Sequence, residues 1–99
     1  MSKAVFQTNY KLKKRADVPD FLQAFEALKD GFVSEQTGFV SWQLMKDGEV
    51  WSDAITFETM EDLENFEKAS ANPNELALTF YGFLNVNSCK TQRFTIEKE

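Results

Sequence analysis

The stretch Gly38–Phe66, GFVSWQLMKDGEVWSDAITFETMEDLENF, decides the fold of this chain. Asp47 and Gly48 separate two runs rich in Val, Ile, Trp and Phe, and a turn residue followed by glycine is typical of a tight β-hairpin. Thr59 then stands where a helix can begin, with an acid three residues further on. Apolar residues follow at helical spacing. The stretch therefore predicts a hairpin that leads directly into a capped amphipathic helix.

The register of this hairpin follows from the position of its turn. A two-residue turn at Asp47-Gly48 pairs Leu44 with Trp51 and Trp42 with Asp53. One face then holds both tryptophans and Asp53. The opposite face holds a smaller and more polar set, namely Phe39, Ser41, Gln43, Met45, Val50, Ser52, Ala54 and Thr56. A longer loop would shift the register, and a slip of one residue exchanges the faces.

The size of the chain predicts a single domain over residues 1–99 with a small core. Ten Phe, two Trp and two Tyr residues are a heavy apolar load for this length. Such an excess favours a subunit interface or an internal cavity, and the alternative is a Phe-rich core.

Charge and residue usage exclude several classes of function. The net charge of −5 argues against a nucleic-acid partner. The chain has no histidine, which removes Ser-His and Cys-His catalysis, most zinc sites and histidine ligation of haem. Cys89 is alone, so no intramolecular disulfide is possible. The acids between Glu58 and Glu67 complement the positive end of a helix, and we expect no metal site there.

Targeting and membrane signals are also lacking in this sequence. The first residues, MSKAVFQTNYKL, contain no apolar core of a signal peptide. No segment approaches the roughly 20 apolar residues of a membrane span. We therefore expect a cytoplasmic protein without a membrane partner.

The remaining elements complete an alternating pattern. Residues 4–12 alternate as a strand, and Asp17 with Pro19 marks the start of a helix that continues toward Thr37-Gly38. Gly31 within this segment either weakens the last turn or ends the helix early. Asn72 and Pro73 mark a further helix, expected from about residue 73 to about 84. Residues 85–87 are turn-like, and residues 88–96 alternate as a last strand.

The order of these elements predicts an α+β fold, the ferredoxin-like βαββαβ pattern with an extra short helix before the last strand. The right-handed crossover rule puts the helices on one face of a four-stranded antiparallel sheet. The strands carry many large apolar side chains, which we expect on both sheet faces. Packing of two uncovered faces would hide them, so we expect a homodimer that forms an α+β barrel.

The chain resembles the dimeric α+β barrel proteins of the antibiotic-biosynthesis monooxygenase (ABM) type. The resemblance covers the whole chain as a pattern, with Gly38-Phe39-Val40 opening the second strand and Phe57–Leu63 at the aromatic-Glu-Ser-x-Glu-Ala turn of that family. It implies a dimer. Members of the family include cofactor-independent oxygenases of polycyclic phenols, haem-degrading oxygenases, isomerases and proteins without an assigned reaction.

The resemblance also bears on cofactors. Asn9 stands where the haem-degrading members place a strand asparagine, and Phe66 lies close to their helix tryptophan. Their axial histidine has no counterpart in this chain. We therefore expect neither haem breakdown nor any other cofactor.

Two hypotheses of different classes remain. The first is a cofactor-independent oxygenase, or a related enzyme, that acts on a small aromatic substrate and needs an apolar pocket and a proton acceptor. We expect its catalytic residues to be Asn9 and Arg93, both directed toward the interior between two sheets. The expected ligand-binding residues are Gln7, Tyr10, Trp42, Trp51, Asp53, Phe66 and Tyr81, with the tryptophans as ring-stacking walls.

The second hypothesis is a non-catalytic dimeric module that binds an apolar ligand or only its own copy. Here Gln7 and Asn9 face solvent or the partner, and Arg93 pairs with an acid. Asp53 then does no more than accept the indole N–H of Trp42 or sit at a strand edge. The tryptophans serve core or interface packing.

Overall fold

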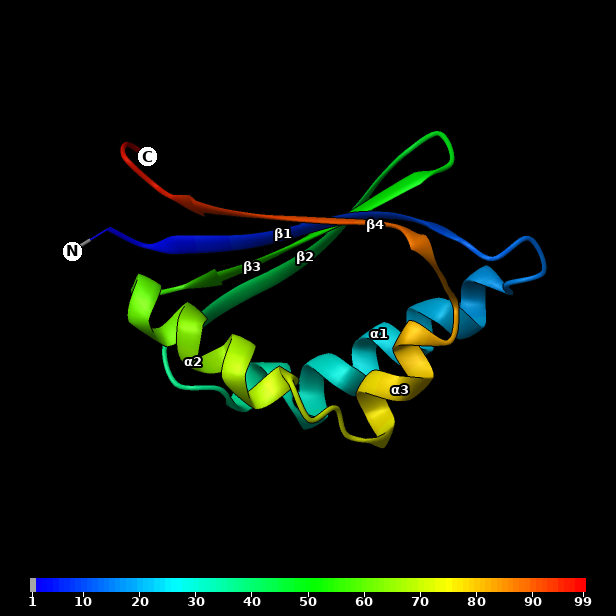
Figure 1. The fold of residues 1–99 in the computed structure, drawn as a ribbon, viewed down its shortest axis with the longest axis horizontal. Coiled ribbons are helices and arrows are strands. Elements are labelled where there is room, and N and C mark those ends of the chain that lie inside the picture. Colours follow the sequence, from blue (N-terminus) through cyan, green and yellow to red (C-terminus); the bar gives the residue numbers. More distant parts are fainter. Residues whose placement is uncertain (1) are drawn as a thin grey trace.

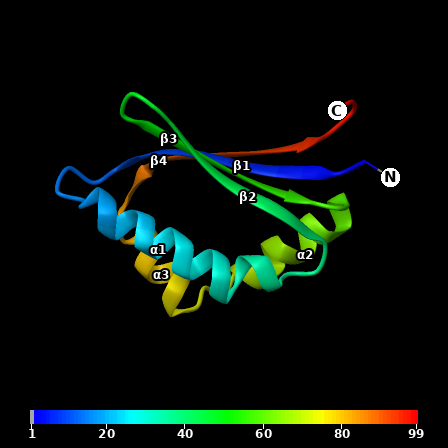
Figure 2. The same ribbon diagram turned by 180° about the vertical axis from the view of Figure 1, so that it is seen from behind.

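The structure is a computed structural model that describes residues 2–99. Its elements follow one another along the chain as β1 (Ala4–Leu12), α1 (Val18–Gly31), the short 3-10 helix η1 (Val33–Glu35), β2 (Phe39–Asp47), β3 (Val50–Phe57), α2 (Met60–Ser70), α3 (Glu75–Tyr81) and β4 (Leu84–Thr95). The strands form one antiparallel sheet in the order β2-β3-β1-β4. All three α-helices cover the same face of this sheet (Figure 1, Figure 2). The predicted α+β ferredoxin-like order with a short extra helix is confirmed.

The helices begin at capping side chains. The Asp17 carboxylate accepts the backbone N–H of Asp20 at 3.1 Å, and the Thr59 hydroxyl accepts that of Asp62 at 3.1 Å. Both predicted caps are confirmed. For α3 the predicted cap, Asn72, is wrong, because the side chain of Asn74 accepts the N–H of the residue three positions on at 2.8 Å. This helix is also shorter than predicted and ends at Tyr81.

The hairpin register differs from the predicted one. Asp47 pairs with Val50, and Trp42 pairs with Ile55, so the two turn residues are Gly48 and Glu49. Gly48 takes a positive φ of 61°, a conformation that glycine adopts without strain. Each partner is displaced by two residues relative to the prediction. An even displacement leaves every side chain on its own face.

The predicted sharing of one face by the tryptophans and Asp53 is confirmed. Trp42, Trp51 and Asp53 are all buried beneath the helices. Phe39 is an exception to the predicted opposite set, because the register shifts between Phe39 and Ser41. This bulge turns the Phe39 ring toward the core, where it packs against the buried cluster.

β4 starts earlier than predicted and carries a wide irregularity. Asn9 pairs with Lys90, but Lys11 pairs with Asn85, so extra residues of β4 loop out opposite Tyr10. The hydroxyl of Ser88 accepts the backbone N–H of Lys11 at 2.9 Å and fixes this bulge. The segment 85–87, predicted as a turn, therefore lies inside the strand.

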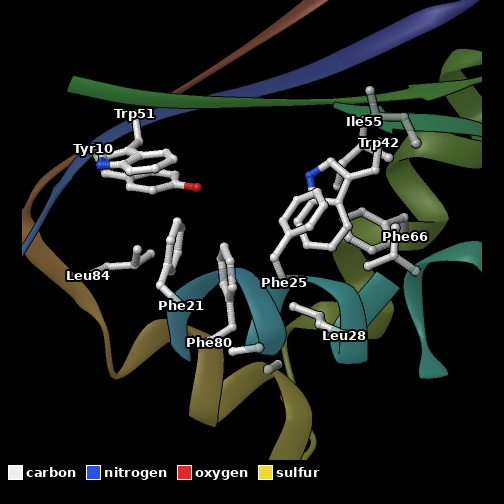
Figure 3. Close-up of a cluster of buried hydrophobic side chains, with 14 of the residues drawn as sticks. Tyr10, Phe21, Phe25, Leu28, Trp42, Trp51, Ile55, Phe66, Phe80 and Leu84 are labelled. Atoms are coloured by element: carbon white, nitrogen blue, oxygen red, sulfur yellow. The ribbon is translucent and has the colours of Figure 1, made fainter. Parts of the chain in front are cut away.

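The hydrophobic core lies between the sheet and the helices (Figure 3). Phe21 and Phe80 stack with their ring centroids 5.3 Å apart, and Phe25 lies 4.2 Å from Trp42. The opposite sheet face is mixed, with Gln7 of β1 at its centre and the exposed apolar side chains of Met45, Val50 and Phe94 on its other strands. Large apolar side chains therefore occur on both faces, but the alternation of the strands directs most aromatic rings toward the helices. Within residues 2–99, no helix is long and apolar enough to cross a membrane.

Candidate active site

A cavity of about 370 Å³ lies between the inner face of the sheet and the helices. Its walls come from all four strands, from α1, α2 and α3 and from the connection between α2 and α3. Apolar side chains dominate these walls, and Phe6, Phe32, Phe66 and Phe80 are among the aromatic ones. The volume falls in the range of small-molecule sites. The cavity can hold a flat apolar molecule of two or three rings.

Asp53 places a carboxylate in this apolar cavity. Its side chain projects from β3 and is 5% exposed, which makes it the one buried charged residue within residues 2–99. The hydroxyl of Tyr10 on β1 donates a hydrogen bond to Asp53 Oδ2 at 2.8 Å. A buried charge needs such donors, because it has lost its water.

The surroundings of Asp53 bring its titration close to neutrality. Burial raises the pKa of Asp53 from its usual 3.8 to about 6, against the opposing effects of the Tyr10 hydroxyl and the Trp42 indole, which favour the charged form. Burial and the charge of Asp53 raise the pKa of Tyr10, so its hydroxyl stays a donor. A carboxylate with a pKa of about 6 is suited to accept a proton at neutral pH.

Two further titratable groups of the cavity have raised pKa values. Tyr81 of α3 and Cys89 of β4 both line it. Burial, followed by the charge of Asp53, raises the pKa of each. The Cys89 side chain is therefore a neutral thiol and a poor nucleophile. Its place in the wall follows from the bulge of β4, which no sequence pattern indicates.

The structure brings together five of the predicted site residues. They line the cavity from five different elements and are Tyr10, Trp42, Asp53, Phe66 and Tyr81. Trp51 lies on the same sheet face but outside the cavity wall, where its ring contacts Phe21 at 5.1 Å and the Lys46 ammonium at 5.4 Å.

The other predicted residues lie outside the cavity. Gln7 and Asn9 are on the outer sheet face, where the Gln7 amide donates to Asn9 Oδ1 at 3.2 Å. Arg93 pairs with Phe6 across the strands and contacts Glu67 at 3.3 Å and Glu64 at 3.8 Å on α2. The expectation that Asn9 and Arg93 point into one interior is wrong, because they face opposite sides of the sheet. Whether either acts in catalysis stays a prediction.

Metal-ligating groups do not gather anywhere in residues 2–99, since no three His, Cys, Asp or Glu side chains converge there. The acids at the start of α2 spread around the helix. Glu67 belongs to the same helix and lines the cavity, and its carboxylate forms an ion pair with Arg93 at 3.3 Å.

No protein-family model and no curated protein matches this sequence. Solved structures do match its fold. SnoaB, a cofactor-independent oxygenase from Streptomyces nogalater, superposes with a TM-score of 0.74 at 16% identity, over 100% of this chain and 97% of that one. PA3566 from Pseudomonas aeruginosa superposes with a TM-score of 0.68 at 11% identity, over 99% and 97%.

A candidate antibiotic biosynthesis monooxygenase from Caulobacter crescentus CB15 gives a TM-score of 0.71 at 11% identity, over 98% of this chain and 92% of that one. At sequence identities this low, the TM-scores establish a likeness of fold alone. The predicted resemblance is thereby confirmed at that level, and the chain has the ABM-type ferredoxin-like fold over its whole length.

Proposed function

We propose that this chain is a cofactor-independent oxygenase that acts on a small aromatic substrate in the cavity between the sheet and the helices. The observation that carries the proposal is the carboxylate of Asp53, buried in an aromatic cavity and titrating with a pKa of about 6. The likeness of fold to a cofactor-independent oxygenase supports it.

In this mechanism Asp53 removes a proton from an acidic O–H or C–H of the substrate. The substrate anion then reduces O₂ directly, so that an activated CH₂ group and O₂ become a carbonyl group and H₂O. One oxygen atom enters the product, and the other leaves as water together with the two hydrogens. The oxidant is O₂ and the reductant is the substrate itself, so the balance needs no further redox partner.

The protein contributes position and environment to these steps. Tyr10 orients the carboxylate of Asp53 through its 2.8 Å hydrogen bond. Rings such as Phe6 and Phe66 form apolar walls that exclude water and hold a flat substrate. Tyr81 lines the cavity and is 40% exposed, which locates it where the cavity meets solvent.

The alternative is a non-catalytic dimeric module that binds an apolar ligand in the same cavity. It is favoured by the lining of the cavity, where Asp53 is the one buried charged residue within residues 2–99. In either case we propose a homodimer formed through the outer sheet face, as the ABM resemblance implies, and a cytoplasmic location.

Oxygen uptake tests the proposal. Anthrone is a tricyclic carbon acid whose CH₂ group can be oxidised to the carbonyl of anthraquinone. We expect the wild-type protein to speed O₂ consumption and anthraquinone formation above the blank, and Asp53→Asn to remove most of this increase. Binding of anthrone with no increase over the blank would favour the non-catalytic module.

A further inference from the structure

We infer that Trp42 is a positioning residue for Asp53, and that it acts through its indole N–H, which donates to the charged carboxylate, rather than through its ring. The inference rests on the proposed function only in calling Asp53 the base.

The ring faces of Trp42 are already occupied by protein. Phe25 lies against the indole with a centroid distance of 4.2 Å and an interplanar angle of 39°, and Phe80 meets it edge-on at 5.7 Å. A ligand could stack on Trp42 only by displacing one of these rings. The predicted role of Trp42 as a stacking wall for a ligand is therefore poorly suited to this geometry. It also gives no role to the indole N–H.

The indole N–H is buried and lacks an aligned acceptor within residues 2–99. Trp42 itself is 6% exposed, so the group is shielded from bulk water. An uncompensated buried N–H is costly, and native structures retain few of them without a role.

The sheet brings this N–H to Asp53. Trp42 on β2 pairs with Ile55, two residues from Asp53 on the same face of β3. Tyr10 reaches the same carboxylate from β1, on the other side of β3. In Figure 3 the indole nitrogen of Trp42 is turned toward the side of the Tyr10 hydroxyl. The strand order thus places one aromatic donor on each side of Asp53, Tyr10 on β1 and Trp42 on β2.

No positively charged side chain within residues 2–99 lines the cavity to stabilise the charge of Asp53. Its titratable residues within residues 2–99 are Tyr10 of β1, Glu67 of α2, Tyr81 of α3 and Cys89 of β4, and no lysine or arginine is among the lining residues. These groups are neutral or negative. The carboxylate therefore depends on hydrogen-bond donors, and the indole of Trp42 is one of the two that favour its charged form.

The test is a pH titration of the Asp53 side-chain carboxyl carbon by NMR, in the intact protein. In Trp42→Phe we expect the pKa of Asp53 to rise so that its ionisation constant falls about three- to tenfold. Trp51→Phe is the matched control, since Trp51 is equally buried on the same sheet face but lies outside the cavity wall. It should leave the pKa of Asp53 unchanged.

A second variant separates the N–H from packing. In the Trp51→Phe background Trp42 is the one tryptophan left, so a tryptophan auxotroph can place 3-benzothienylalanine there, with sulfur in place of N–H and the same ring shape. We expect the same rise in the pKa of Asp53 as in Trp42→Phe. An unchanged pKa in the benzothienyl protein, or an equal rise in Trp51→Phe alone, would overturn the inference.

Oxygen uptake distinguishes this inference from the proposed function. If the benzothienyl protein shows the raised pKa of Asp53 while the wild type consumes no oxygen, the inference stands and the oxygenase proposal fails. If the wild type is active and its pH profile is the same in the benzothienyl protein, the inference fails alone.

Discussion

Tyr10 and Asp53, 43 residues apart in the sequence, are joined by a 2.8 Å hydrogen bond on the helix-covered face of the sheet. The bond exists because β1 lies next to β3, where Thr8 pairs with Asp53 and Tyr10 with Trp51. Tyr10 and Asp53 are therefore diagonal neighbours on one face. The carboxylate of Asp53, buried in an apolar cavity, thus has a neutral hydrogen-bond donor in the Tyr10 hydroxyl.

Removal of this donor should disfavour the charged form of Asp53. We expect Tyr10→Phe to raise the pKa of Asp53 above about 6 and to lower the free energy of unfolding by about 1 kcal/mol at neutral pH. The ring and its contacts with Phe21 and Phe80 remain in this variant. An NMR titration and urea unfolding measure the two effects. Tyr81→Phe is the control, and equal titration curves for both variants would contradict the role of Tyr10.

The buried carboxylate should cost stability at neutral pH. The pKa of Asp53 is higher in the folded protein, about 6 against the usual 3.8, so the folded state binds this proton more tightly. Stability from this group is then present below about pH 4 and is lost as the pH rises to about 6, by about 3 kcal/mol in total. Asp53→Asn cannot ionise and escapes this loss.

Urea unfolding across pH 4 to 8 tests this sign. We expect Asp53→Asn and the wild type to be of similar stability near pH 4, and the variant to be the more stable protein near pH 7. The other carboxylates contribute equally to the pH dependence of both proteins, so their contributions cancel in the difference between the two free energies of unfolding. A difference that is constant with pH would show that Asp53 ionises normally in the folded state.

Alternation predicted which side chains share a face, and it did so even where the register was wrong. Trp42 and Asp53 stayed together because the hairpin shift was even. Alternation does not say which face the helices cover. In β4 the pairing of Arg93 with Phe6 sends Arg93 toward α2 and Phe94 outward, the reverse of what the apolar residues of that strand indicate.

The position of the cavity also depends on topology that local patterns do not contain. The contact of Tyr10 with Asp53 requires β1 between β3 and β4. Cys89 reaches the wall through a bulge of β4 within a segment predicted as turn and strand. The residue types of the site were predictable from the sequence, but their convergence was not.

Gly38 should be the glycine that tolerates substitution least. Its φ is 79°, and a Cβ there would collide with the side chain of Asp62, whose own Cβ would lie 2.8 Å away. Gly48 has a similar φ of 61° with nothing within 4 Å, so Gly48→Ala is a matched control for backbone strain alone. We expect Gly48→Ala to cost about 1 kcal/mol and Gly38→Ala clearly more, by urea unfolding. Equal losses would mean that Asp62 moves aside freely.

The proposed catalytic roles of Asn9 and Arg93 compete directly with that of Asp53. Neither residue lines the cavity, and Arg93 forms exposed ion pairs, which contribute about 0–1 kcal/mol to stability. From these positions we expect Asn9→Ala and Arg93→Ala to keep most of the anthrone-dependent oxygen uptake, whereas Asp53→Asn loses it. If the two alanine variants lose as much activity as Asp53→Asn, the site includes the edges of the sheet and its outer face.

The outer sheet face should form the interface of the proposed homodimer. Ala54 lies near its centre, paired with Gln7 on one side and Gln43 on the other, and Phe94 at its rim is 43% exposed. A charge at this centre would have to be buried against a second copy without a partner, which is costly.

Light scattering tests this interface. We expect wild-type protein at micromolar concentration to show twice the chain mass of 11.4 kDa. We expect Ala54→Arg to show the single chain mass while its helical circular dichroism is retained. Leu78→Arg is the control, since Leu78 is 57% exposed on the helix side of the molecule and should leave the dimer intact. A wild-type protein at the single chain mass throughout this range would exclude the dimer.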